Sequence, residues 1–249
     1  MKLKQILLIF FLLFFLKNHA QNTPVNKVYG LPLDTLKKMV TKHPRYFKHL
    51  KNKWVKEPQK MTSDEMMLLY YGSCFLPDYQ PVKEDKAVAK IAGLLSEMDF
   101  ENALIEGKKL LKVYPLNARL NMLLGYAAKK TGQKRLADYY YKKYADLLRI
   151  PLYSGTGQNY EHAFVVRLVS DEYLILNQKD LELVEQAVRY YQKIPFDEFL
   201  VHKKFKDNKP MQTLPKQKLY MNIYLPFFVG QHKNFEMVQD EAKRKYKIK

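Results

Sequence analysis

Cysteine is almost absent from the 249-residue sequence, which contains only Cys74. One thiol cannot form an intramolecular disulfide, so the fold has to be stabilised by burial of apolar side chains alone. Cys74 lies in the segment "LLYYGSCFLPDYQPV" (68–82), and a free cysteine in such an apolar, aromatic run usually packs as a small hydrophobe. We expect Cys74 to be buried; a reactive thiol or an intermolecular bridge is the alternative.

The sequence also lacks a hydrophobic run long enough to span a membrane, which takes roughly 20 apolar residues. Its longest run, 6–16, follows Lys2 and Lys4 and precedes Ala20. A basic start, a short apolar stretch and a small residue are typical of a secretory signal peptide. We predict a signal peptide at 1–20, cleavage near Ala20 and an exported protein, periplasmic or secreted; an uncleaved anchor is the alternative.

Arginine is scarce in a strongly basic chain. The net charge is +18, and +15 remains without the three lysines of the predicted signal peptide. Only seven of the basic residues are arginine, the residue type suited to bidentate phosphate contacts, and no nucleic-acid-binding motif is present. We expect a solvated basic surface and no nucleic-acid partner; binding of a polyanion or of an envelope surface through this basic surface is an alternative.

Motifs for catalysis, cofactors and metals are missing as well. The histidines are scattered, so no pair has the spacing of metal ligands on a helix. Cys74, His162 and Asp171 have the residue types of a nucleophilic triad, but nothing in the sequence brings them together. The "SGTG" at 154–157 lacks the Gly-Lys-Ser/Thr ending of a phosphate-binding loop. We assign no catalytic, cofactor-binding or metal-binding residue and expect no cofactor.

Helical patterns dominate the first half of the chain. Apolar residues recur at helical spacing in 31–44 and 45–58, and a proline ends each segment. Thr62 and Glu65 have the spacing of a capping box, in which each side chain satisfies the other's free backbone N–H. This spacing predicts a helix that runs to about Phe75.

Four amphipathic segments follow, at 84–99, 100–115, 117–132 and 133–148. They resemble the tetratricopeptide repeat, which has a period of 34 residues and small residues where paired helices pack. The matching positions are Ala103, Pro115, Leu124, Gly125, Ala137 and Tyr141. The positions that depart from the motif are Gly107, Leu110, Asn121 and Ala128. The match covers about one and a half repeats.

The composition changes after Pro151. Residues 152–163 are rich in Gly, Ser, Thr and Asn, so we predict a loop. Residues 164–177 are dense in β-branched and aromatic side chains, so we predict two short strands or one bent strand, with Asp171 and Glu172 in the turn. Two more segments alternate as strands do: 196–205 and 218–228. The segment 180–194 fits either a helix or a strand.

Helices come first and strands last, which predicts an α+β fold of tetratricopeptide-like helical hairpins followed by a small antiparallel β-sheet. The predicted regions are a signal peptide (1–20), a flexible start (21–30), a helical tetratricopeptide-like region (31–150), a small β-rich region packed on the helices (151–230) and a lysine-rich tail (231–249).

Tyrosine is abundant, with 19 copies, and several are adjacent. A tyrosine ring suits both cores and binding surfaces. Adjacent residues on a helix point about 100° apart, so adjacent tyrosines cannot all face the core. Our candidates for a recognition surface are Tyr139, Tyr140, Tyr70, Tyr71 and Tyr79. Packing at the edge of the core is the alternative.

Two motifs resemble a family of exported proteins of Bacteroidetes-type bacteria that is classified as a domain of unknown function. In "LLYYGSCFLPDYQP" the matching residues are Leu69, Tyr70, Tyr71, Gly72, Tyr79 and Pro81. In "SGTGQNYEHAFVVRLVSDEYLIL" they are Ser154, Gly155, Gly157, Ala163, Phe164, Asp171, Glu172 and Tyr173. Val82 replaces a usual tyrosine and Thr156 a usual aspartate. The resemblance covers roughly residues 30–230 and implies no reaction.

These observations favour a non-enzymatic exported protein that acts as an interaction or scaffold module. A tetratricopeptide-like helical groove would bind a protein, a peptide or another envelope component. A secreted hydrolase with its site at the junction of helices and sheet is the alternative from another class.

Overall fold

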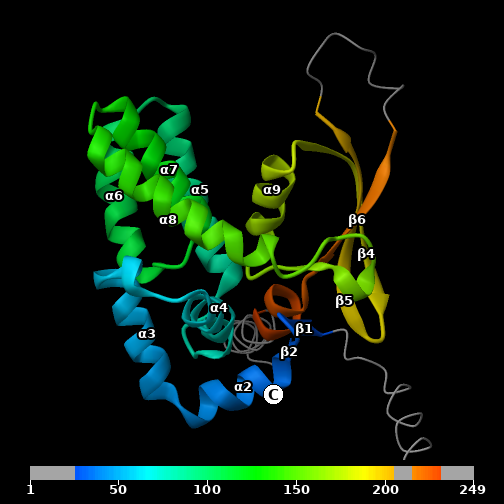
Figure 1. Ribbon diagram of the computed structural model, residues 1–249. Helices are drawn as coiled ribbons and strands as arrows, with labels where there is room; N and C mark the ends of the chain where they lie inside the picture. Colours follow the sequence, from blue (N-terminus) through cyan, green and yellow to red (C-terminus); the bar gives the residue numbers. More distant parts are fainter. Residues whose placement is uncertain (1–25, 205–214, 231–249) are drawn as a thin grey trace, which may run out of the picture.

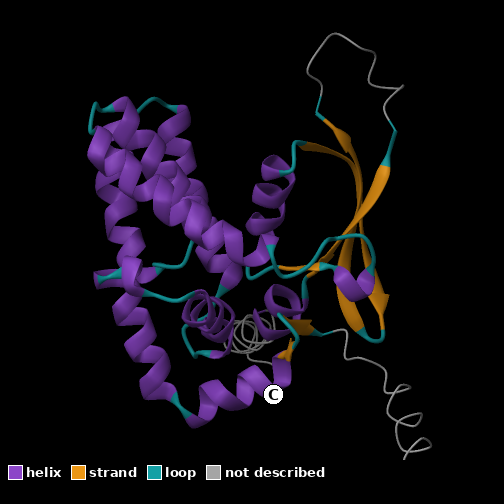
Figure 2. Cartoon of the chain, viewed as in Figure 1, coloured by secondary structure: helices purple, strands orange, loops and turns teal. Residues whose placement is uncertain are grey.

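A computed structural model of the protein describes residues 26–204 and 215–230. The predicted signal peptide, half of the predicted flexible start (21–25) and the lysine-rich tail lie outside the described residues. Helices form one side of the molecule and a twisted sheet forms the other (Figure 1; Figure 2). No helix in the two described ranges is both long and apolar enough to cross a membrane.

The chain starts with a short pairing of β1 and β2 and continues with helices. The bounds are β1 (Lys27–Val28), β2 (Leu31–Pro32), α2 (Leu33–Lys42), α3 (Pro44–Lys56), η2 (Pro58–Lys60), α4 (Ser63–Gly72) and η3 (Ser73–Phe75). The predicted capping box is confirmed: the N–H of Glu65 donates to Thr62 Oγ1 at 3.2 Å, and the N–H of Thr62 donates to Glu65 Oε2 at 2.9 Å. Together α4 and η3 form the helix that this box predicts.

The four segments with tetratricopeptide-like character form two helix pairs. They are α5 (Pro81–Ser96), α6 (Phe100–Val113), α7 (Ala118–Lys130) and α8 (Lys134–Leu152), and they pack side by side (Figure 1). Small residues allow the close approach. A Cβ on Gly107 would lie 2.5 Å from Leu124, and one on Gly125 would lie 2.8 Å from the ring of Tyr141.

The prediction of strands over 164–177 is wrong beyond the first two residues. Only β3 (Phe164–Val165) is a strand, and α9 (Val169–Gln178) follows it. Asp171 starts this helix by accepting the N–H of Leu168 at 3.0 Å. The helix is buried on several sides because it packs against both the other helices and the sheet. Its buried residues include Ser170, Asp171 and Glu172, whereas Val169 and Tyr173 are exposed, so polar residues do not mark the solvent face. The amphipathic pattern of a surface helix is therefore missing from the sequence.

The sheet has the strand order β3-β6-β5-β4. The other strands are β4 (Leu181–Tyr191), β5 (Ile194–Lys203) and β6 (Gln217–Asn222). The β4–β5 and β5–β6 pairs are antiparallel as predicted, whereas β3 and β6 are parallel, so the sheet is mixed. The ambiguous segment 180–194 is therefore mostly strand.

The strand predicted over 218–228 ends early. The N–H of Tyr224 donates to Asn222 Oδ1 at 2.9 Å, which turns the chain, and a short helix, η6 (Leu225–Val229), follows. A second short helix, η4 (Tyr160–His162), lies in the predicted loop before β3.

One hydrophobic core connects the helices to the sheet. It extends from Phe47 and Trp54 on α3 through Ile175 on α9 to Met221 on β6. A second, separate cluster fills the space between α5, α6, α7 and α8. The first core positions the candidate site, because α4, α8 and the segment around residue 167 all contribute to it.

Gly72, the glycine of the Leu-Tyr-Tyr-Gly motif, is expected to tolerate no side chain. A Cβ there would lie 2.3 Å from Cε1 of Phe47, whose ring is buried. Gly72→Ala is expected to lower the free energy of unfolding by about 1–3 kcal/mol through overpacking, measured by urea denaturation. Gly93→Ala is the control, because no atom lies within 4 Å of its added Cβ. Equal effects of the two substitutions would contradict the prediction.

Candidate functional site

The two motifs that resemble the family meet in the interior through three tyrosine hydroxyls. Tyr70 Oη donates to Asp171 Oδ2 at 2.6 Å, and Tyr71 Oη donates to the carbonyl of Val165 at 2.9 Å. Tyr79 Oη donates to the carbonyl of Arg167. Burial holds the pKa of all three phenols well above the usual range, so they act as neutral donors. These three side chains fasten α4 and the turn after it to the start of the β-rich region.

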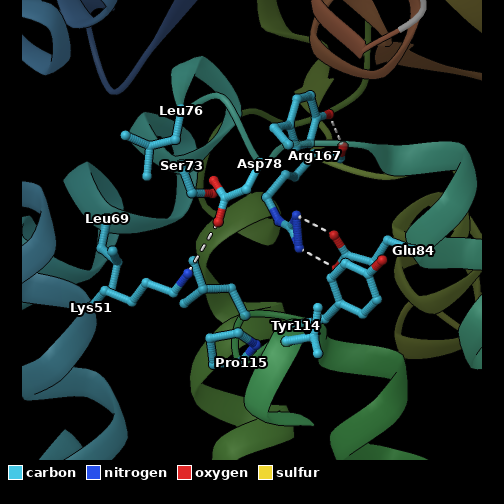
Figure 3. Close-up of a pocket in the computed structure, with 12 residues that line it drawn as sticks. Lys51, Leu69, Ser73, Leu76, Asp78, Glu84, Tyr114, Pro115 and Arg167 are labelled. Carbon is cyan, nitrogen blue, oxygen red and sulfur yellow. Dashed lines mark hydrogen bonds and ion pairs between the residues drawn. The ribbon is translucent and has the colours of Figure 1, made fainter. Parts of the chain in front are cut away.

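A buried ion pair lies beside the tyrosines. The guanidinium of Arg167 binds the carboxylate of Glu84 on α5 with two hydrogen bonds (Figure 3). Asn117 Nδ2 donates to the same carboxylate at 3.0 Å. The rings of Tyr70 and Tyr79 lie 5.7 and 5.9 Å from the guanidinium, within range of cation–π attraction. Every charged atom of the pair except Arg167 Nε has a partner in the described residues.

The cavity next to this pair is too small for an organic substrate. Its volume is about 40 Å³, and an ion pair between Lys51 and Asp78, 3.2 Å long, stands at its rim (Figure 3). A space of this size holds one or two water molecules. The residues around Arg167 connect the helices to the β-rich region through the hydrogen bonds described above.

Asp171 and Glu172 do not form the predicted turn between strands. Both lie in the first turn of α9 and are buried. Burial raises the pKa of Asp171 to about 6, although Arg167 opposes the shift. Burial and the nearby Asp197 on β5 hold the pKa of Glu172 well above its usual range. Glu172 therefore binds its proton more tightly than a free carboxyl does, with Asp197 as its neighbour, and Gln186 Nε2 donates to Asp197 Oδ2 at 2.8 Å.

Cys74, His162 and Asp171 do not form a hydrogen-bonded triad. His162 is exposed, and its Nδ1 lies 2.8 Å from Asn159 Oδ1. Cys74 is buried, as expected, and burial raises the pKa of its thiol to about 12, so it stays protonated at neutral pH. Within the described residues, no three His, Cys, Asp or Glu side chains converge as metal ligands.

A larger groove lies between the helices, on the side of α4 and α8. We call it the α4–α8 groove. It has a volume of about 340 Å³ and runs between the first turns of α4 and the C-terminal half of α8. The apolar and aromatic part of its lining consists of Trp54, Met61, Met66, Met67, Ile150 and Tyr153. This volume falls in the range of clefts that bind ligands.

Charged residues surround the apolar part of the α4–α8 groove. Lys142 and Asp146 form an ion pair of 2.9 Å across one turn of α8. Arg149 and Asp64 also line the groove, and neither has an ion-pair partner in the part of the chain that the structure describes. The groove thus offers one unpaired charge of each sign beside an apolar surface.

Lys143 is a residue that the sequence reasoning missed. It is buried on α8, with Nζ 4.6 Å from the ring of Trp54 and 5.3 Å from the ring of Tyr139. Burial lowers its pKa to about 8. Trp54 is held from its other side, because Nε1 donates to the carbonyl of Pro115 at 2.8 Å. Tyr140, Lys143 and Leu147 follow helical spacing, which places this lysine on the buried face of α8. The spacing was the available signal, but the chain contains so many lysines that this one did not stand out.

The five tyrosines selected from the sequence lie in different environments. Tyr70, Tyr71, Tyr79 and Tyr140 are buried, whereas Tyr139 is 44% exposed. Two tyrosines that were not selected, Tyr29 and Tyr153, are 45% and 70% exposed and line the α4–α8 groove. Tyr29 Oη donates to the carbonyl of Ile150 at 2.7 Å, which fixes its ring at the groove.

Removing one partner of the buried ion pair between Glu84 and Arg167 is expected to lower the free energy of unfolding more than removing both partners does. Glu84→Gln alone leaves the guanidinium of Arg167 buried without its counter-charge, and Arg167→Met alone does the same to the carboxylate of Glu84. Each is expected to lower the free energy of unfolding by about 3–5 kcal/mol. The double variant is expected to be more stable than either single variant. Urea denaturation of the four proteins measures the coupling. Lys109→Met is the control, because its pair with Glu106 is exposed and contributes less than about 1 kcal/mol; additive effects at positions 84 and 167 would contradict the prediction.

The two buried carboxyls of α9, Asp171 and Glu172, are expected to contribute less to stability as pH rises from acid to neutral. A carboxyl whose folded pKa is raised binds its proton more tightly in the folded state, so its contribution is full below the unfolded pKa and is lost as pH rises through the folded pKa. For Asp171 this loss is complete above about pH 6, and the raised pKa of Glu172 adds a second loss. Glu172→Gln is expected to remove the second loss, so that its advantage over wild type grows with pH.

Unfolding free energies in urea between acid and neutral pH test this expectation. Glu101→Gln on the exposed face of α6 is the matched control, since it makes the same chemical change at an exposed side chain. A constant difference between Glu172→Gln and wild type across the range would show that Glu172 does not retain its proton.

Comparison with known proteins identifies a family but no relative of known activity. A search of curated proteins finds no match, and a search of solved structures finds none either. A family model with the description "Domain of unknown function (DUF4919)" matches residues 34–205, from α2 to the end of β5. This range is more than half of the chain and includes both motifs, so the protein belongs to the DUF4919 family.

Proposed function

We propose that the protein is a non-enzymatic binding module that holds a segment of another polypeptide in the α4–α8 groove. The observation that carries the proposal is the composition of the accessible lining of this groove, which consists of exposed tyrosines, half-buried methionines and an exposed arginine. These residue types are enriched at the centres of protein interfaces. Methionine also adapts to side chains of different shape, which suits recognition of a peptide.

The chemistry of the groove favours a segment with one large apolar side chain beside acidic residues. The apolar side chain would pack between Met61, Met67 and Tyr153. A neighbouring acidic residue would pair with Arg149, which has no ion-pair partner in the described residues. The net charge of +18 would also steer an acidic partner toward the protein.

The location of the partner follows from the sequence. If 1–20 is a signal peptide, the protein meets its partner in the periplasm or outside the cell, so an envelope protein or a secreted protein would supply the segment. The hydrolase alternative has less support, because Cys74 is a buried thiol and His162 contacts Asn159 instead.

Selection of short random peptides from a display library, with the whole protein as bait, tests the proposal. Selected peptides are expected to share an aromatic or aliphatic residue beside acidic residues. Tyr153→Ala and Met61→Asp are each expected to weaken binding of a selected peptide by about tenfold or more, which corresponds to about 1.4 kcal/mol. Fluorescence anisotropy of the labelled peptide measures the change.

Tyr126→Ala is the matched control, because Tyr126 is 40% exposed on α7 and does not line the groove. It is expected to leave binding within about twofold. The proposal fails if no peptide is enriched above background, or if the enriched peptides bind the Tyr153→Ala and Met61→Asp variants as well as they bind wild type.

A further inference from the structure

Strand β4 forms an open edge of the sheet. In the described part of the chain it pairs with β5 alone, although it is 11 residues long. Strands in globular proteins are usually about 5–6 residues long, and a long edge strand presents a row of free N–H and C=O groups that another strand can pair with. From Glu185 to Tyr190 every residue is exposed except the half-buried Ala187.

The turn after β4 determines which of its backbone groups point outward. Tyr191 pairs with Ile194, and the two residues between them, Gln192 and Lys193, have φ of 48° and 65°. Two positive φ values in a two-residue loop define a type I′ turn. The hydrogen bond that closes such a turn points the backbone of Tyr191 toward β5.

Backbone groups of successive strand residues point to opposite sides of the strand. Arg189, Ala187 and Glu185 therefore point their N–H and C=O groups toward β5, as Tyr191 does. Gln186 and Val188 point theirs away from the sheet, where a partner strand would lie. Only registers that pair these outward residues with one another form a regular antiparallel ladder.

A second copy of this chain fits the edge in one register. Two identical strands related by a twofold axis pair antiparallel around one residue. With the axis at Ala187, Gln186 pairs with the partner's Val188, and Glu185 lies opposite the partner's Arg189. Twofold symmetry repeats this contact, so two ion pairs form across the edge.

Neighbouring registers lose this complementarity. An axis at Gln186 or Val188 places Glu185 opposite an alanine or a tyrosine, and an axis at Glu185 itself places two glutamates opposite each other. Cross-strand pairs of opposite charge stabilise a sheet and pairs of like charge destabilise it. In the described residues neither Glu185 nor Arg189 forms an ion pair within its own chain, although Arg189 is near enough to Glu198 on β5 to lower the pKa of that carboxyl.

The uncharged residues of β4 agree with the same register. Ala187 would lie on the axis in a non-hydrogen-bonded pair, where the two chains come closest and a small side chain fits. Val188 and Tyr190 are 48% and 58% exposed on the single chain. A strand on this edge would cover part of both side chains, which an isolated chain leaves in water.

We propose that the protein forms a symmetric dimer in which β4 pairs antiparallel with β4 of a second copy around Ala187, so that one continuous sheet spans both copies. This interface is independent of the proposed peptide site, because the α4–α8 groove shares no residue with β4. A dimer would display two grooves, and a partner with two binding segments would then bind with increased avidity.

Disulfide crosslinking tests the register directly. The native Cys74 is buried, so a new surface cysteine is the main reactive thiol. In oxidising buffer Ala187→Cys is expected to form a dimer that reducing agent dissolves, because the two Cα atoms on the axis come within disulfide range. Glu185→Cys is the matched control: its two copies would lie roughly 14 Å apart along the strands and should not crosslink. Equal crosslinking of both variants overturns the proposed register.

Charge reversal tests the two ion pairs. Glu185→Arg and Arg189→Glu are each expected to weaken the dimer by about tenfold, because each creates like-charge pairs across the edge. The double variant restores both pairs and is expected to dimerise within about twofold of wild type. Sedimentation velocity over a range of concentrations measures the equilibrium, and circular dichroism checks the fold. A monomeric wild-type chain at the highest concentration, or a double variant no better than the single variants, overturns the proposal.

Discussion

The buried guanidinium of Arg167 is the constraint on which the remaining architecture depends. Removing a charged group from water costs several kcal/mol unless a well-placed counter-charge and further hydrogen bonds compensate it. Here the carboxylate comes from Glu84 on α5, its orientation is fixed by Asn117 at the start of α7, and the rings of Tyr70 and Tyr79 pack on the cation. Three separate parts of the sequence, 70–84, Asn117 and Arg167, must therefore be in place together, which couples the helix pairs to the sheet.

This coupling explains why the two family-like motifs contain the residues that they do. Tyrosine supplies a large ring for the core together with a donor that can reach a distant acceptor. In this chain Tyr71 and Tyr79 donate to backbone carbonyls between α8 and α9 that no strand partner satisfies, and Tyr70 donates to the aspartate that starts α9. Gly72 then leaves room for the ring of Phe47. Packing at the junction of helices and sheet thus accounts for these motif residues, and no catalysed reaction is needed to explain them.

Short sequence patterns predicted the parts of the fold that depend on residues close together in the sequence. The capping box at Thr62, the prolines and the 34-residue spacing of Ala103 and Ala137 predicted helices whose boundaries the structure confirms within a few residues. The signals failed in α9, where the polar Ser170, Asp171 and Glu172 are buried and the apolar Val169 is exposed. They also failed for Lys143 and for the tyrosines of the junction. The partners of Tyr70 and Tyr71 lie 101 and 94 residues away, and no short-range pattern reports such a contact.

The junction around Arg167 connects the helices that form the α4–α8 groove to the sheet whose edge is β4, and it therefore sets the distance between the two surfaces. The α4–α8 groove is built on helices, β4 lies at the far edge of the sheet, and the ion pair of Arg167 and Glu84 stands in the connection. A dimer through β4 would therefore hold its two grooves at a fixed separation, because the junction resists bending. Avidity depends on whether a partner's two segments match the separation of the two sites. A buried ion pair contributes little net stability compared with an apolar core of the same volume, yet it fixes one arrangement of the elements around it. In this protein that fixed arrangement would set the distance over which a bivalent partner is recognised.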